Sequence, residues 1–261
     1  MITAASNSRI KRLVQLNQKS KLRRTEDVFL AEGVKMFLEA PREQLQEVYV
    51  SESFLEKCSC REHLEEVGYE VVSDSVFSKI SDTCTPQGVL CVLKQFHYNI
   101  EEMLRDKAPL FLLLENIQDP GNLGTMLRTG EGAGVSGIIM SRDTVDLYNQ
   151  KVIRSTMGSI YRVPFYYADD FAAAVHQVQQ AGVSVYAAHL RGKNSYACQD
   201  YTKGTAFLIG NEGNGLREET AELADCYIRI PMEGKVESLN AAVASSILMY
   251  EAHRQRATLE K

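Results

Sequence analysis

The sequence predicts an α/β protein built from two domains. Short apolar runs, of the length of buried strands, alternate with helix-like segments in both halves of the chain, which is typical of sheets covered by helices. A more polar stretch, residues 96–109, shows no strand pattern and separates the halves. The 261 residues are enough for two ordinary domains. We therefore expect a small α/β domain at residues 1–95, a linker at 96–109 and a larger domain at 110–261.

The elements of the first half follow from its apolar runs and turn residues. A basic amphipathic helix begins the chain, because Ile10, Leu13 and Val14 fall at helical spacing. Strands are expected at residues 28–31, 48–50, 69–72 and 88–93. Helices are expected at residues 34–40, 63–67 and 74–80.

The second half predicts a mostly parallel sheet covered on both faces. Its strands are expected at residues 110–114, 138–140, 163–167, 183–187, 207–209 and 226–231, and its helices at 122–131, 150–160, 171–181 and 241–253. Residues 207–240 organise this half, because two apolar runs there each end in a loop with glycines. Ligands of open α/β sheets bind beyond the carboxyl ends of strands, so these loops form the expected ligand site.

Composition excludes several classes of protein. The hydrophobic content of 44% and the charged content of 24% are those of an ordinary globular protein. No apolar run approaches the roughly 20 residues that span a bilayer, and no signal-peptide pattern begins the chain. The six cysteines form no C-x-x-C pair, which favours a reduced, cytoplasmic protein. The five histidines are scattered, so we expect no metal site.

The charges are unevenly distributed along the chain. The net charge is −5, yet residues 1–24 contain seven lysines and arginines and no acidic residue. A basic segment on an acidic body is typical of a nucleic-acid contact. The residues expected to contact RNA phosphates are Arg9, Arg12, Arg23 and Arg24. The alternative is a helix whose charged face is merely solvated.

One glycine motif is misleading. Residues 132–137, GAGVSG, match the dinucleotide fingerprint G-x-G-x-x-G. That fingerprint follows a strand and opens a helix, whereas here a predicted helix precedes it and a predicted strand follows. We interpret these glycines as a helix C-cap and turn.

Polar residues gather just after three of the predicted strands, and the stretches that contain them resemble a known family. The stretches are ENIQDPGNLGTMLRT at 115–129, IGNEGNGL at 209–216 and IPMEGKVESLNAAVA at 230–244. In this order they resemble the three motifs of the SpoU-type RNA 2′-O-ribose methyltransferases. FLAEGVK at 29–35 and PQGV at 86–89 are similar to the substrate-binding domain of that family. The resemblance therefore covers nearly the whole chain.

The resemblance implies the fold and the partners. It implies a C-terminal SPOUT-type parallel-sheet domain with a trefoil knot, preceded by a ribosomal-protein-like RNA-binding domain. It also implies S-adenosyl-L-methionine as methyl donor, and a homodimer that shares its active site. Residues 241–253 are apolar nearly all round, which favours a dimer through this helix and the helix of the first motif.

The resemblance also implies roles for single residues. The cofactor is expected to contact Leu208, Gly210, Asn211, Gly215, Ile230, Met232, Ser238 and Leu239. The catalytic group is expected to be Asn122, Arg128, Glu212, Ser238 and Asn240. Arg128 stays protonated, so it is expected to bind the target phosphate and stabilise the nascent alkoxide rather than act as a base. Glu212 is expected to orient Arg128 or to take part in proton removal, and the base stays unassigned.

Three hypotheses compete at this point. The first is methyl transfer to ribosomal RNA, favoured over transfer RNA because the N-terminal domain resembles that of ribosomal enzymes. The second is a catalytically idle RNA-binding protein, which the intact polar motif residues argue against. The third is a Rossmann-like nucleotide enzyme, which lacks a glycine fingerprint in the required order.

Overall fold

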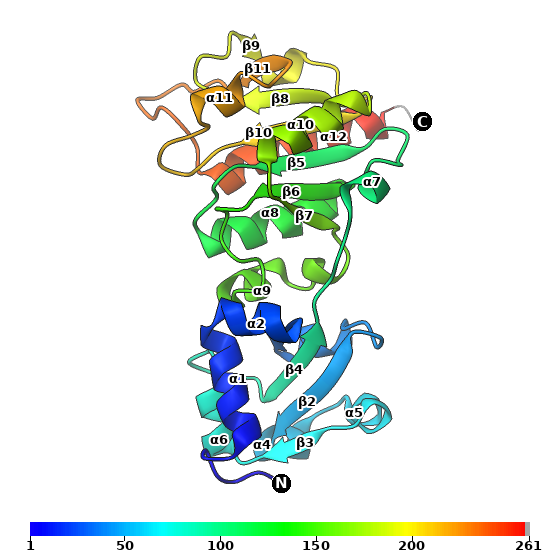
Figure 1. Cartoon of the computed structure of the whole chain (residues 1–261), viewed down its shortest axis with the longest axis vertical. Coiled ribbons are helices and arrows are strands. Elements are labelled where there is room, and N and C mark those ends of the chain that lie inside the picture. Colours follow the sequence, from blue (N-terminus) through cyan, green and yellow to red (C-terminus); the bar gives the residue numbers. More distant parts are fainter. Residues whose placement is uncertain (259–261) are drawn as a thin grey trace. The chain divides into compact units, whose positions relative to one another are not determined.

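The computed structural model describes residues 1–258 of the chain, which form two compact units. Unit 1 comprises residues 1–96 together with 146–161, and unit 2 comprises residues 97–145 together with the chain from 162 onward. Each unit has its own sheet. Figure 1 shows the elements of both units along the chain.

Unit 1 is built around a four-stranded mixed sheet of order β1-β4-β2-β3. β1 and β2 both run antiparallel to β4, whereas β3 is parallel to β2. The strands are β1 (Val28–Glu32), β2 (Leu45–Ser51), β3 (Glu70–Val72) and β4 (Val89–Lys94). The helices are α1 (Ser8–Gln18), α2 (Ser20–Glu26), α3 (Val34–Leu38), α4 (Glu52–Lys57), α5 (Arg61–Val67), α6 (Asp74–Ile80) and α9 (Gln150–Thr156), followed by the 3-10 turn η1 (Ser159–Tyr161).

The apolar face of the basic helix is part of the core of unit 1. Ile10, Leu13 and Leu16 are buried against α6 and the sheet, as their helical spacing requires. The single helix expected here is two helices, because the backbone is extended at Lys19. The C-cap of α2 is Asp27, in the left-handed region at φ 56°.

Residues 146–161 belong to unit 1, whereas the sequence placed them in the C-terminal domain. Every residue of β1 is buried, so its second face needs a cover. The Tyr148 ring packs on Phe29 with centroids 4.7 Å apart, and Gln150 Nε2 donates to the Leu30 carbonyl at 2.9 Å. No apolar periodicity reveals this cover, because it joins segments more than a hundred residues apart.

Unit 2 contains a seven-stranded parallel sheet of order β7-β6-β5-β10-β8-β11-β9. The strands are β5 (Leu110–Leu114), β6 (Gly137–Ser141), β7 (Phe165–Ala168), β8 (Ser184–Ala188), β9 (Asn194–Ser195), β10 (Thr205–Ile209) and β11 (Cys226–Arg229). The helices are α7 (Ile100–Met103), α8 (Pro120–Ala133), α10 (Phe171–Gln180), α11 (Glu218–Ala221) and α12 (Ala241–Ala257), with the 3-10 turn η2 (Tyr196–Cys198). The α/β class and the parallel sheet expected from the sequence are confirmed.

Helices cover both faces of this sheet. Phe111 and Leu113 of β5 pack with Val175 and Val178 of α10 in one cluster. Alternate residues of a strand point to opposite faces, so the rest of β5 faces the other layer, where α8 and α12 pack together. The C-cap of α8 is Gly134 at φ 76°, which confirms that the glycine pattern at 132–137 is a helix end and turn.

The register of the central strands brings two of the motif loops together. β5 and β10 pair in parallel so that Leu114 lies opposite Ile209, the last residue of each strand. The Glu115 N–H donates to the Ile209 carbonyl at 2.9 Å. The two loops therefore leave the sheet side by side, although 95 residues separate Leu114 from Ile209.

Candidate functional site

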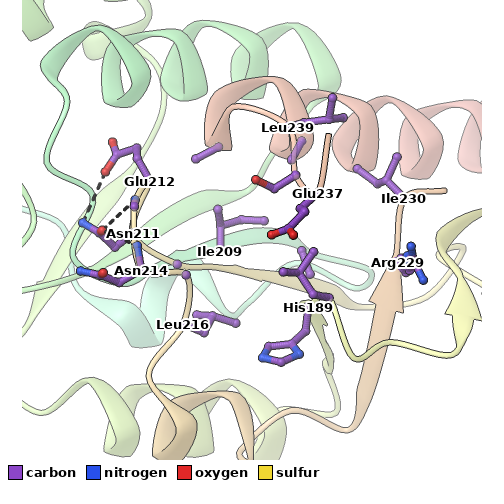
Figure 2. A pocket seen from close by; sticks show the side chains of 18 of the residues that line it. His189, Ile209, Asn211, Glu212, Asn214, Leu216, Arg229, Ile230, Glu237 and Leu239 are labelled. Carbon is purple, nitrogen blue, oxygen red and sulfur yellow. Dashed lines mark hydrogen bonds between the residues drawn. The ribbon is translucent and has the colours of Figure 1, made fainter. Parts of the chain in front are cut away.

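A cavity of about 340 Å³ opens at the carboxyl ends of β8, β10 and β11. This is the edge where the sequence predicts a ligand site. Figure 2 shows the side chains that surround the cavity. Its lining residues are Ala188, His189, Leu190, Ile209, Gly210, Asn211, Glu212, Gly213, Asn214, Gly215, Leu216, Ile228, Arg229, Ile230, Met232, Glu237, Ser238, Leu239, Ala241 and Ala244.

A tight hairpin at residues 211–215 forms one wall of the cavity. Asn211 and Gly215 exchange two backbone hydrogen bonds of 3.0 and 2.9 Å. The Asn211 Oδ1 accepts from the N–H groups of Gly213 and Asn214, and its Nδ2 donates to the Asn116 carbonyl. The Asn211 side chain thus holds the loop from inside, as amide side chains in turns commonly do.

Gly210 is required where the hairpin brings the backbone of residues 215–216 against it. A Cβ at this position would lie 2.2 Å from the Gly215 carbonyl carbon and from the Leu216 nitrogen. No side chain fits at that distance, so the backbone of 215–216 packs directly on Gly210. Gly215 itself has φ +70°, which glycine adopts without strain.

A buried carboxylate fixes the far end of the same loop. Glu115 is 1% exposed, and its carboxylate accepts from the Arg217 N–H at 2.8 Å and from the Thr220 hydroxyl. The Arg217 guanidinium also contacts Glu115 and pairs with Asp143. The loop between β10 and α11 is therefore anchored at both ends to the first motif.

Glu212 joins the first and second motifs. Its carboxylate accepts from the N–H groups of Gln118 and Asp119 at 3.0 and 2.9 Å, and from Asn122 Nδ2 at 3.0 Å. Asp119 in turn caps α8, because its Oδ1 accepts from the Asn122 N–H at 2.8 Å. Glu212 thus holds the chain where it enters α8.

Asn240 joins the third motif to the other two. Its Nδ2 donates to Asn122 Oδ1 at 2.9 Å, while its Oδ1 caps α12 by accepting from the Ala242 and Val243 N–H groups. A continuous series of hydrogen bonds therefore runs from Glu212 through Asn122 to Asn240. The three motifs meet through these side chains beside the cavity.

The surroundings of Glu212 bear on its expected roles. Burial opposes its ionisation, but hydrogen bonds from Asn122 and from the Gln118 and Asp119 backbone outweigh burial and lower its pKa. A carboxylate with a lowered pKa is a poor proton acceptor, and its oxygens already accept these donors. Within residues 1–258 it forms no bond to Arg128. The structure therefore supports an anchoring role for Glu212 rather than the two that the resemblance implied.

Arg128 is the exposed cation of the first motif. It lies on α8, and its guanidinium makes no hydrogen bond or ion pair with any residue in the described part of the chain. Arginine carries its charge at every pH at which proteins fold. An exposed guanidinium without an internal partner is available to a phosphate or another anion.

The third wall is a segment without regular structure, residues 230–239. Ile230, Met232, Ser238 and Leu239 all line the cavity from it. Of the residues expected to contact a cofactor, only Leu208 does not line the cavity, because its side chain is fully buried within β10 in the cluster beneath α10.

His189, Arg229 and Glu237 line the cavity but were absent from the sequence-based site. His189 follows β8, and Arg229 is the last residue of β11, so the rule that placed polar residues at strand ends would have found both. The His189 ring packs on Tyr227 with centroids 5.0 Å apart. Burial and the Arg191 charge lower its pKa, which favours the neutral imidazole.

The four arginines expected to contact RNA differ in their surroundings. Arg23 is 3% exposed, and its guanidinium donates to the Leu16 and Asn17 carbonyls and pairs with Asp146. A phosphate cannot reach it, so its assignment as an RNA contact is wrong. Its burial follows from the cover that residues 146–161 provide, which the sequence pattern did not reveal.

The other three arginines are accessible to different degrees. Arg12 pairs with Glu26 at 2.6 Å and with Glu47 at 2.7 Å, so its charge is compensated inside unit 1. Arg9 pairs with Glu70 at 3.1 Å on the surface, where ion pairs contribute little to the free energy of folding. Arg24 is exposed and has no ion pair within residues 1–258.

Two further observations concern ions and membranes. The described residues contain no cluster of three or more histidine, cysteine, aspartate or glutamate side chains placed to hold a metal ion. Among helices in residues 1–258, none combines the length and apolar character of a membrane span. The six cysteines all carry free thiols.

Comparison with known proteins assigns a family to each part of the chain. Residues 109–250 match the SpoU rRNA Methylase family, and residues 7–91 match the MRM3-like substrate binding domain. A 23S rRNA (guanosine(2553)-2′-O)-methyltransferase of Bacillus subtilis, RlmP, is 32% identical over 252 residues, which cover 95% of this chain and 97% of the relative.

Solved structures show the same similarity. The AdoMet-bound rRNA methyltransferase from Sinorhizobium meliloti superposes with a TM-score of 0.83 at 31% identity and covers 97% of both chains. The SpoU methyltransferase AviRb from Streptomyces viridochromogenes, in complex with the cofactor AdoMet, superposes with a TM-score of 0.87 at 26% identity. That match covers 97% of this chain and 99% of AviRb.

Proposed function

The chain belongs to the SpoU rRNA methylase family and is an S-adenosylmethionine-dependent RNA 2′-O-ribose methyltransferase, and we propose that it methylates 23S-type ribosomal RNA. The linkage of all three motifs, through Glu212, Asn122 and Asn240, beside the cavity supports methyl transfer at this site. The similarity to the Bacillus enzyme extends over both units and favours ribosomal over transfer RNA.

The cavity fits the cofactor. Leu216, Ile230 and Leu239 give it apolar walls for a nucleoside base, while the close backbone approach at Gly210 presents peptide groups rather than side chains. When bound, S-adenosylmethionine supplies a methyl group on a positively charged sulfur. The residues proposed to hold it are Gly210, Asn211, Gly215, Ile230, Met232, Ser238 and Leu239.

The residues of the chain itself position the ribose and stabilise charge. Asn122 bonds to both Asn240 and Glu212, so the geometry of the two asparagines is fixed before substrate arrives. Ser238 lines the cavity two residues before Asn240 and offers a hydroxyl to the sugar. Arg128 binds the target phosphate and stabilises the oxygen as its proton leaves.

Unit 1 binds the RNA through the basic residues that stay accessible. Lys11, Lys19, Lys21 and Arg24 are exposed and form no ion pair within residues 1–258. Phosphate contacts of this kind supply affinity without reading sequence. This set replaces the arginines chosen from charge alone, with Arg9 as a peripheral contact.

The enzyme acts as a homodimer through α8 and α12. Val243 and Tyr250 on α12 remain 48% and 49% exposed although α12 packs on α8 within the chain. A two-fold partner is the common way to cover such a face. Analytical ultracentrifugation at micromolar concentration tests this, and a fully active monomer would refute the interface.

One experiment tests the proposed function directly. The protein is incubated with labelled S-adenosylmethionine and with either ribosomal or transfer RNA from a strain that lacks the gene. Digestion and mass spectrometry then locate the label. We expect 2′-O-methylnucleosides in the large ribosomal RNA. Label confined to transfer RNA would exclude the ribosomal substrate, and label on a base would exclude ribose methylation.

A further inference from the structure

Two charged side chains of the cavity have no partner inside the chain. Glu237 and Arg229 both line it, and neither forms a hydrogen bond or ion pair with any residue in the range 1–258. The other charged group, Glu212, is occupied by the first motif. Charged groups that line a cavity without internal partners are suited to a ligand that carries the opposite charges.

The cofactor carries such charges at one end. Its amino-acid end has an α-ammonium group and an α-carboxylate on the same carbon. A guanidinium binds a carboxylate through two parallel hydrogen bonds, and a carboxylate accepts from an ammonium group. Figure 2 shows Glu237 between Glu212 on the left and Arg229 on the right.

We propose that Glu237 binds the α-ammonium group of S-adenosylmethionine and that Arg229 binds its α-carboxylate. The pairing rests on the proposed function, because it takes the cavity to be the cofactor site. It adds two cofactor-binding residues that were absent from the sequence-based site.

The two residues come from segments of different character. Arg229 ends β11, which is paired in the sheet, so its backbone is fixed in advance. Glu237 lies in residues 230–239, where no backbone group forms a hydrogen bond to the described chain. A cofactor held by Glu237 would therefore also fasten this segment over the cavity. Arg229 sets the position of the amino-acid end, and Glu237 closes on it.

Charge complementarity supports the pairing. Glu212 and Glu237 bring two negative charges to the cavity and Arg229 brings one positive charge. S-adenosylmethionine has two positive charges and one negative charge, so the balance is opposite in sign. The demethylated product keeps the same amino-acid end but loses the charge on sulfur.

Calorimetry with three ligands separates the contacts in the full-length protein. S-adenosylhomocysteine carries the complete amino-acid end, decarboxylated S-adenosylmethionine keeps only the ammonium group, and 5′-methylthioadenosine has neither. The variants are Glu237→Gln and Arg229→Met. The controls are Glu233→Gln, on the same segment but outside the cavity lining, and Arg105→Met, an exposed arginine of unit 2.

Each variant has its own expected pattern. Glu237→Gln should lower the affinity for S-adenosylhomocysteine and for the decarboxylated ligand by roughly tenfold or more, the usual effect of losing a charged hydrogen bond. Arg229→Met should lower the affinity for S-adenosylhomocysteine by a similar factor and leave the affinity for the decarboxylated ligand unchanged. Neither variant should change the affinity for 5′-methylthioadenosine, and the controls should bind all three ligands like the wild type.

Other outcomes overturn the pairing in recognisable ways. Equal losses for 5′-methylthioadenosine and S-adenosylhomocysteine would show that the substitutions act on the nucleoside or on the fold. Unchanged affinities would show that the amino-acid end lies elsewhere. A wild-type protein that binds none of the three ligands would overturn the proposed function itself, and the pairing with it.

Discussion

Unit 1 and unit 2 both carry polar or charged residues that the sequence marks as functional, but these residues are bonded differently in the two units. In unit 2 the motif residue Asn122 bonds to both Glu212 and Asn240, and these bonds fix the geometry of a site. In unit 1 two of the marked arginines, Arg12 and Arg23, are neutralised by acids of the same unit. Internal bonding builds the site in unit 2, whereas in unit 1 it removes arginines from the candidate surface.

A count of charges along the sequence does not show which cations the fold pairs with acids. The first 24 residues contain no acid, yet acids from distant positions, such as Glu47 and Asp146, form ion pairs with them in the fold. A cation is available to a ligand only when the fold leaves it unpaired. By that criterion Arg128 of unit 2 and Arg24 of unit 1 are the comparable residues.

Removal of Arg128 should have the largest effect. Arg128→Ala should lower the rate of methyl transfer by about 10²–10³, the usual cost of losing a group that stabilises developing charge. Cofactor affinity should stay near that of the wild type, because Arg128 does not line the cavity. Turnover assays beside calorimetry with S-adenosylmethionine measure both quantities. Arg105→Ala is the matched control, and wild-type turnover by Arg128→Ala would remove the residue from the mechanism.

Neutralising the basic surface of unit 1 should have the second-largest effect, on RNA binding. Replacing Lys11, Lys19, Lys21 and Arg24 by glutamine should reduce the dependence of log affinity on log salt by up to roughly 3, since each lost phosphate contact removes about 0.7–0.9. Titrations of labelled ribosomal RNA at several salt concentrations measure this slope. The control carries the same charge change on the same unit, at Lys35, Lys57, Lys79 and Lys94. Equal slopes for the two variants would show that the basic helices are only a solvated surface.

Much of the fold and part of the site could be predicted from the sequence. Residues 110–114 form β5 as expected, because five consecutive apolar residues suit a strand buried on both faces. The motif resemblance located most of the cavity wall, including Gly210. Glycine spacing alone could not say why that residue is needed, since the reason is the close approach of the backbone at 215–216.

The remaining features depend on contacts between distant segments. Nothing in the pattern of residues 146–161 indicates that they cover β1, and the burial of Arg23 follows from that cover. Glu212 was assigned chemistry because it is an acid in a motif, whereas its donors come from residues 118–122. The trefoil knot and the dimer stay predictions of the family resemblance.

A substitution of Arg23 tests whether its buried side chain stabilises unit 1. Arg23→Met should destabilise the protein by about 3 kcal/mol, because Asp146 and two backbone carbonyls lose their donor. Arg24→Met, one residue along, should change stability by less than about 0.5 kcal/mol because its side chain is exposed. Urea unfolding followed by circular dichroism compares the two. If both variants were equally stable, the internal role assigned to Arg23 would be wrong.

The smallest expected effect concerns Glu212 and depends on pH. The pKa of Glu212 is lowered in the folded protein, so its ionised form stabilises the fold above the unfolded pKa of about 4.3, and this contribution is lost as pH falls through the folded value. Glu212→Gln should therefore cost about 1 kcal/mol at pH 7, a modest loss because the carboxylate is partly exposed to water.

The destabilisation caused by Glu212→Gln should shrink as the wild-type carboxylate takes up its proton below pH 4. Thermal unfolding of wild type and variant at pH 7 and in acid tests this sign, and Glu222→Gln, an exposed acid of unit 2 with no hydrogen bond from its side chain to residues 1–258, is the control. A difference that grew on acidification would mean that Glu212 is protonated in the native protein. Glu212 would then again be a candidate for removing the proton from the ribose hydroxyl. Its carboxylate would no longer be an example of a charged group held by internal hydrogen bonds in unit 2.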